Sequence, residues 1–171
     1  MSKDNTGKFG VRVVSLLLIA GGIVGLVTVI WSEISLLQQT GFRPSSMAAF
    51  FGAGAVLFGF STWTGVDLWR GKPSALRRAK VLFAAQIPYI SLPGFVCQFF
   101  TGFMFTIFFN SASASRFGLA FRFGSYLRFW ISSAIENLVL GVNVVAVIVL
   151  IYLIRVASPE HGKKQERFGL I

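Results

Sequence analysis

The stretch that decides the fold runs from Val81 to Ser115 and reads VLFAAQIPYISLPGFVCQFFTGFMFTIFFNSASAS, without one charged side chain. As a single helix it would be about 52 Å long, whereas the hydrocarbon core of a bilayer is about 30 Å thick. The stretch must therefore break or leave the membrane. Pro88 and Pro93 lie in its first half, and we expect a membrane helix that ends near Pro93.

The composition predicts an integral membrane protein. Of 171 residues, 54% are hydrophobic and only 13% are charged, which is too apolar for an ordinary soluble domain. The formal net charge of +10 does not predict a nucleic-acid partner, because the basic residues flank apolar runs instead of gathering on one face or in one tail. We expect a single membrane domain, residues 1–171, whose partner is a lipid bilayer with anionic headgroups.

The apolar segments predict an all-α integral membrane protein, a four-transmembrane-helix bundle. The expected spans are about 12–32, 47–69, 76–94 and 134–155, with an outer segment at 95–131 and a cytoplasmic tail at 156–171. The first span is expected to be a retained anchor, since no convincing cleavage site follows it.

Small residues predict how the first two spans pack. Gly21 and Gly25 form a G-x-x-x-G pair, which favours an internal helix contact over a dimer seam or no role. The second span carries small residues on one helical face, and this face is expected to meet those glycines: Ala48, Gly52, Ala55 and Gly59.

Beyond Pro93 the hydrophobic pattern alternates with a period of two. Phenylalanine occupies most of the alternate positions in two runs, Phe99 to Phe109 and Phe117 to Phe123, separated by a small polar segment. This pattern predicts a small, Phe-rich, extracytoplasmic β-hairpin between the third and fourth helices. A kinked helix that continues to about Phe109, followed by an interfacial helix, is the alternative.

Three polar residues fall within or beside the expected spans and are the candidate site residues: Asp67, Gln86 and Asn143. For Asp67, an ion pair with Arg70 at the membrane surface is favoured over a functional carboxylate. For Asn143, an interhelical hydrogen bond, with Gln86 as a candidate partner, is favoured over contact with a substrate. At Gln86 and Pro88, a kinked helix is favoured over a polar cavity between helices. Catalytic, cofactor and metal sites are not expected, because Cys97 and His161 are the only cysteine and histidine.

The distribution of basic residues predicts the orientation. With both termini in the cytoplasm, 12 Lys and Arg lie on the inner side and 4 on the outer side, which the positive-inside rule favours. The outer four are Arg43, Arg116, Arg122 and Arg128.

Three segments carry a loose resemblance to a family: Ala85-Gln-Ile-Pro88, Phe121-Arg-Phe-Gly-Ser125 and Gly141-Val-Asn-Val-Val-Ala146. The second half of the chain, which holds them, resembles small uncharacterised bacterial four-span membrane proteins. That resemblance implies a multi-pass protein of the bacterial cytoplasmic (inner) membrane and no particular activity.

Two functions are compatible with these features. The first is a non-enzymatic accessory or interaction protein whose outer aromatic segment contacts a membrane-protein partner or the membrane. The alternative is a small transporter or channel subunit that acts as a homo-oligomer and uses Asp67, Gln86 and Asn143. A membrane enzyme is not expected, because the acidic residues are scattered along the chain.

Overall fold

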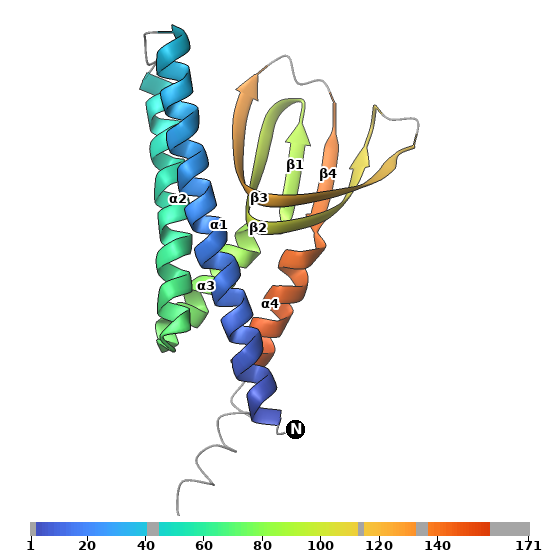
Figure 1. Cartoon of the computed structure of the whole chain (residues 1–171). Helices are drawn as coiled ribbons and strands as arrows, with labels where there is room; N and C mark the ends of the chain where they lie inside the picture. The colour runs from blue at the N-terminus through green and yellow to red at the C-terminus, as the bar shows by residue number, and fades with distance from the viewer. Residues whose placement is uncertain (1–2, 41–44, 113–114, 133–136, 158–171) are drawn as a thin grey trace, which may run out of the picture.

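The computed structural model describes residues 3–40, 45–112, 115–132 and 137–157 (Figure 1). Four helices and four strands occur in these residues, and the strands form one sheet beside the upper half of the longest helices (Figure 1). The helices are α1 (Lys3–Thr40), α2 (Ser45–Trp69), α3 (Pro73–Ala85) and α4 (Val144–Val156). The strands are β1 (Pro88–Leu92), β2 (Gly94–Asn110), β3 (Phe117–Ser132) and β4 (Val139–Asn143).

The two long helices, α1 and α2, lie side by side and run in opposite directions, and α3 and α4 lie beside their lower ends (Figure 1). The buried core joins these helices to the sheet. Phe58 of α2 is 2% exposed and its ring lies 5.8 Å from that of Phe99 in β2, while Leu18 of α1 and Leu153 of α4 are fully buried.

The sheet is antiparallel throughout, and β2 is its longest strand. Along one edge β2 pairs with β3 over its whole length, from Gly94 opposite Ser132 to Phe109 opposite Phe117. Along the other edge β2 pairs with β1 near its start and with β4 near its end, and β1 pairs with β4. The two ends of β2 therefore close a small ring with β1 and β4, and β3 remains outside that ring as an edge strand.

The third helix ends eight residues before Pro93. Gln86 is its C-cap, and its backbone N–H donates to Leu82 O at 3.2 Å and Phe83 O at 3.1 Å. The helix cannot continue, because Pro88 has no N–H and disfavours helical backbone at Ile87. The freed chain turns into β1, which finds partners in both β2 and β4.

The predicted four-helix membrane bundle is wrong. Among the described residues, one helix is long and apolar enough to cross a bilayer, the segment Phe9–Gln38 of α1. The third and fourth helices have 13 residues each, about 20 Å, which is shorter than the hydrocarbon core. The expected spans 76–94 and 134–155 each combine one of these helices with strand residues.

The predicted multi-pass topology is wrong for the same reason. One candidate span near the N-terminus does not support a multi-pass protein of a bacterial inner membrane with both termini in the cytoplasm, so that localisation is wrong as well. The predicted tail, 156–171, lies outside the described residues apart from its first two positions.

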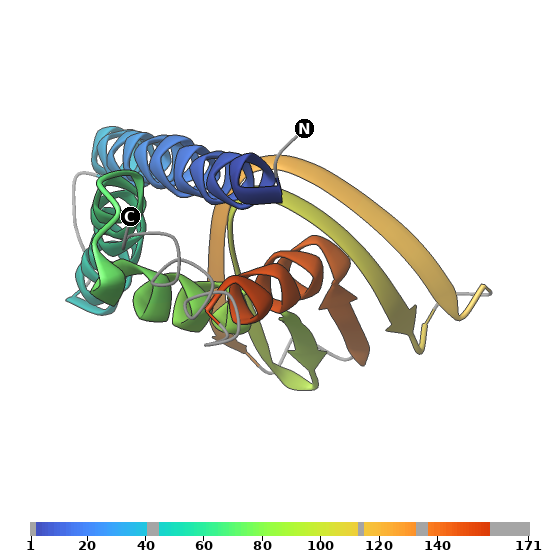
Figure 2. The ribbon, with the colours of Figure 1, turned by 90° about the horizontal axis from the view of Figure 1, so that it is seen from below.

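The predicted hairpin exists, but it is larger than expected. The strand β2 begins before the first alternating run, and β3 continues beyond the end of the second run. The hairpin also belongs to a four-stranded sheet instead of standing alone. In Figures 1 and 2 the tip of β2 and β3 curves away from α1 and α2.

The glycines of α1 make internal contacts, but not with the predicted face of α2. A Cβ on Gly22 would lie 2.7 Å from Phe58 O, and a Cβ on Gly21 would lie 2.8 Å from the carbonyl carbon of Thr101 in β2. Gly52 and Gly59 of the expected stripe have open space around them. The predicted internal contact of the first helix is therefore confirmed, and the predicted stripe on the second is wrong.

Candidate functional site

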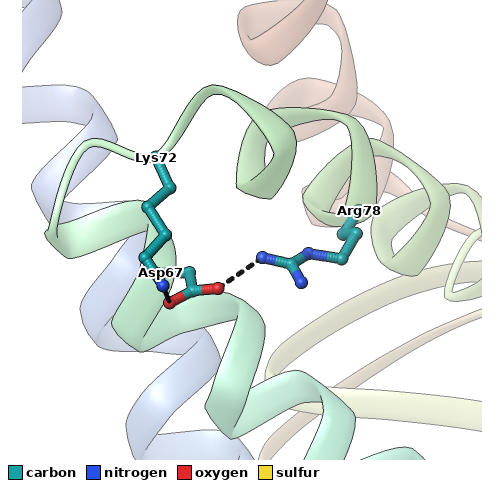
Figure 3. Close-up of polar contacts among 3 residues, drawn as sticks. All are labelled: Asp67, Lys72 and Arg78. Atoms are coloured by element: carbon teal, nitrogen blue, oxygen red, sulfur yellow. Dashed lines mark hydrogen bonds and ion pairs between the residues drawn. The ribbon is translucent and has the colours of Figure 1, made fainter.

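Asp67 lies at the corner between α2 and α3, where two cations hold its carboxylate (Figure 3). Its Oδ1 lies 2.8 Å from Lys72 Nζ and its Oδ2 lies 2.6 Å from Arg78 Nη2. These partners replace the expected Arg70. The side chain is 5% exposed, and the hydrogen bonds from Lys72 and then Arg78 hold the pKa of Asp67 below its usual value.

The corner is further fixed by the backbone and by Trp63. Lys72 N donates to Asp67 O at 3.0 Å, and Gly71 adopts a φ of +73°, which favours glycine. The Arg78 guanidinium carbon lies 4.1 Å from the centre of the Trp63 ring, a cation–π contact. Each oxygen of this nearly buried carboxylate is bound by a cation, and these contacts join α2 to α3.

Gln86 is buried where α3 meets β1. Its Oε1 accepts from Thr101 N at 3.1 Å and its Nε2 donates to Thr101 Oγ1 at 3.0 Å. Thr101 lies in the part of β2 between its pairing with β1 and its pairing with β4, where a backbone N–H on that edge has no strand partner. The Gln86 side chain supplies the missing partner.

Asn143 does the same at the other junction, where β4 meets α4. Its Oδ1 accepts from Ala146 N and from Phe105 N, both at 3.4 Å, so it caps the helix and completes the hydrogen bonding of β2. Its backbone N donates to Ile87 O at 2.9 Å, which joins the two junctions. The Nδ2 of Asn143 and the Oγ1 of its register partner Thr106 have no hydrogen-bond partner in the described part of the chain.

The three predicted site residues thus divide into two places. Gln86 and Asn143 lie at neighbouring helix-to-strand junctions, and Asp67 lies at the α2–α3 corner; no hydrogen bond between described residues joins Asp67 to either amide. The expected hydrogen bond between Gln86 and Asn143 across a helix bundle is not formed. Each of the two side chains bonds to β2 instead. All three act on the protein's own backbone or side chains.

A different feature remains without an internal partner: one face of the β2–β3 hairpin. Four directly opposed pairs place eight apolar side chains on this face, which we call the aromatic face: Phe103 and Phe123, Phe105 and Phe121, Ile107 and Leu119, Phe109 and Phe117. On β3 the exposed fractions are 72% for Phe117, 67% for Leu119, 61% for Phe121 and 77% for Phe123.

The rings of the aromatic face contact one another across the strands. The Phe103 centroid lies 4.8 Å from that of Phe121 and 5.7 Å from that of Phe123, both edge to face. Phe109 and Phe117 make a similar contact at 5.7 Å. These cross-strand pairs stabilise the hairpin while leaving the outer side of the rings uncovered.

The opposite face of the same hairpin is different. Met104 and Thr106 of β2 are buried there, and Gly118 of β3 lies against the Phe108 ring. Arg122 shares this face, is exposed, and has its guanidinium carbon 5.4 Å from the centre of the Tyr126 ring. The period of two therefore places Arg122 on the face opposite the eight apolar residues of the aromatic face.

Within the described residues no three His, Cys, Asp or Glu side chains gather as a metal site would require. Comparison with protein-family models, with curated proteins and with solved structures finds no match to this chain. The resemblance to small bacterial four-span membrane proteins therefore stays a prediction.

Proposed function

We propose that this protein is a non-enzymatic interaction protein and that the aromatic face of the β2–β3 hairpin is its contact surface. The observation that carries the proposal is the exposure of four consecutive same-side residues of β3, each between 61% and 77% exposed. Large contiguous apolar patches are rare on the free surface of a protein and mark contacts with other molecules or with membranes.

The structural use of the polar residues supports the same proposal. The Asp67 carboxylate is bound by Lys72 and Arg78, and the side-chain oxygens of Gln86 and Asn143 accept from backbone N–H groups of β2. These residues were the motive for a transporter or channel, and the structure gives them positions at two separate joints of the fold. The aromatic face is a contiguous apolar surface that the described part of the fold leaves uncovered.

Photo-crosslinking in cells tests this proposal. A photoreactive phenylalanine analogue would replace Phe121 in one variant and Ala120, the next residue on the opposite face of β3, in a matched control. We expect adducts to lipid or protein from position 121 at several times the yield from position 120, measured by mass spectrometry of the purified chain. Equal yields at the two positions would contradict the proposal.

A further inference from the structure

We propose that the partner of the aromatic face is the interface of an anionic phospholipid bilayer, on which the hairpin lies flat. This inference rests on the proposed function and names the partner of its contact surface. Four observations carry it: the two faces of the hairpin, the free edge of β3, the sign of its charges, and the apolar helix α1 beside it.

The two faces make the hairpin amphipathic. On one side lie the eight apolar residues of the aromatic face, and on the other lie Arg116 and Arg122, which are both exposed. An element built in this way binds in the plane of the interface, with its apolar side about 5–10 Å deep at the boundary between headgroups and acyl chains. Its arginines then reach the headgroup phosphates from the other side.

The free edge of β3 limits how deeply the hairpin can enter the bilayer. In the sheet order β1-β4-β2-β3, the third strand has a neighbour on one side only. The N–H and C=O groups along its outer edge therefore need water or headgroup oxygens, because an unpaired strand edge does not occur in the hydrocarbon core. This requirement excludes deep burial of the hairpin and favours the hydrated interface.

The charges favour anionic lipid over a second copy of the chain. The described residues of β2 and β3 include Arg122 and Arg128, Arg116 directly precedes β3, and these two strands contain no acidic side chain. A second hairpin would bring no acidic side chain to pair with these arginines, whereas anionic headgroups neutralise them. Each basic residue near such a surface contributes about 1 kcal/mol, or roughly a fivefold change in binding.

Helix α1 supplies proximity to the membrane. Its segment Phe9–Gln38 is long and apolar enough to cross a bilayer, and the hairpin packs directly against it, since Ser125 Oγ of β3 donates to Gly21 O. Gly21 lies near the middle of that segment, so we place α1 along the membrane surface, where the hairpin meets the hydrated interface. An α1 that crossed the bilayer would carry the hairpin into the hydrocarbon core, where the free edge of β3 has no partners.

The experiment uses the full chain in lipid nanodiscs. Cys97, the only cysteine, is replaced by serine, and a polarity-sensitive dye is attached to a single new cysteine, F121C or the matched control A120C. In discs that contain phosphatidylglycerol we expect the dye at 121 to shift to the blue and to be quenched by lipids spin-labelled near the headgroup, with at least threefold less quenching at 120.

Charge variants identify which arginines act. We expect the double change R116Q/R122Q to lower the equilibrium constant for docking of the hairpin on the membrane roughly 30-fold. The measured sign is weaker quenching of the dye at 121 by lipids labelled near the headgroup. The control R70Q/R77Q removes two exposed arginines from the α2–α3 corner and α3, and should leave that signal unchanged. Equal quenching in pure phosphatidylcholine discs would overturn the charge-based part of the inference.

Other outcomes separate this inference from the proposed function. Protection of the dye at 121 that rises with protein concentration and not with anionic lipid would identify a second copy as the occupant and overturn the lipid inference. Adducts to protein but not to lipid in the crosslinking experiment would do the same, while the proposed function would stand. An unprotected dye in every disc together with equal crosslinking at 120 and 121 would overturn both.

Discussion

At the scale of single residues, Asp67 shows how position decides between chemistry and structure. Its carboxylate is nearly inaccessible and bound by Lys72 and Arg78, and the hydrogen bonds from these two residues lower its pKa. The folded state therefore binds a proton at Asp67 less readily than the unfolded chain does. The resulting stabilisation is present above the ordinary pKa of 3.8 and is lost as the pH falls through the lower folded value.

We predict that Asp67→Asn lowers the thermal midpoint of the chain in mild detergent at pH 7, because Arg78 loses its counter-charge while remaining only 20% exposed. The difference from the wild type should begin to shrink as the pH falls below about 3.8, because the carboxylate of the unfolded chain then takes up a proton. It should disappear once the pH is below the lower pKa of the folded state. Circular dichroism melts across this pH range measure it. A difference that stays constant down to pH 2 would show that the ion pairs contribute nothing.

Gln86 gives a second prediction at this scale. Gln86→Leu removes both hydrogen bonds to Thr101 and leaves a buried backbone N–H without a partner, so we expect a loss of about 1–3 kcal/mol in the free energy of unfolding. The control Gln38→Leu changes an exposed glutamine of α1 and should have little effect. Denaturant titration compares them, and similar losses in the two variants would contradict the role assigned to Gln86.

The sequence identified the polar residues that matter but not their partners. Asp67, Gln86 and Asn143 stand out as polar groups in apolar surroundings, which is a local property of the sequence. Their partners are Arg78, Thr101 and Phe105, at separations of 11 to 38 residues. The partners of Gln86 and Asn143 lie in β2 and depend on the sheet topology, which was not predicted, whereas Arg78 depends on how α3 packs on α2.

At the scale of elements, glycine determines how closely α1 approaches the sheet. A Cβ on Gly21 would press on the backbone of Thr101 and Gly102, and neither can rotate away as a side chain can. Gly102 itself has a φ of +84° and faces Leu17 O of α1, so the two glycines form the point of closest approach.

We predict that Gly21→Ala destabilises the protein by about 1–3 kcal/mol, the usual effect of overpacking. Gly59→Ala in α2 is the matched control, since open space surrounds Gly59 and alanine favours helix by about 0.5–1 kcal/mol. Opposite signs of the two changes in unfolding free energy, measured by denaturant titration, are expected. A neutral Gly21→Ala would show that α1 does not pack on β2 at this point.

The strand β4 explains why the fourth helix was misplaced. Its residues, Val139 to Asn143, continue directly into the apolar run of α4, and a short apolar run does not distinguish strand from helix by periodicity. The helix begins only after Asn143, whose side chain caps it. Asn143 was therefore read as a residue inside a membrane helix when it is the residue that starts one.

The hairpin was predictable for the opposite reason. Its phenylalanines alternate near the tip of both strands, a pattern typical of an extended backbone, and the small polar segment between the two runs indicates a turn. What the pattern did not show is that β2 also pairs with β1 and β4, because each of those strands has only five residues and adjoins an apolar helix.

At the scale of the whole molecule, the sheet lies beside the upper half of α1 and α2, and α3 and α4 lie beside their lower ends (Figure 1). The β2–β3 hairpin extends outward from the helices. Exposed large apolar side chains occur on all four helices and on the sheet, and the one candidate span among the described residues lies in α1. The aromatic face is the part of this surface that the proposed function uses.

The central claim is that the register of β2 and β3 puts the phenylalanines on one uncovered face. Asn110 N donates to Arg116 O at 2.8 Å, so the pair Ile107 and Leu119, three steps along the ladder, is a close pair without ladder hydrogen bonds. Such pairs have Cα atoms about 4.5 Å apart, within the range that a disulfide spans.

Disulfide formation in full-length C97S chains tests this claim most directly. Cysteines at Ile107 and Leu119 should form a crosslink under mild oxidation, detected by mass spectrometry, whereas cysteines at Ile107 and Ala120, on opposite faces, should not. A crosslink at 107 and 120 with none at 107 and 119 would contradict the register and, with it, the aromatic face.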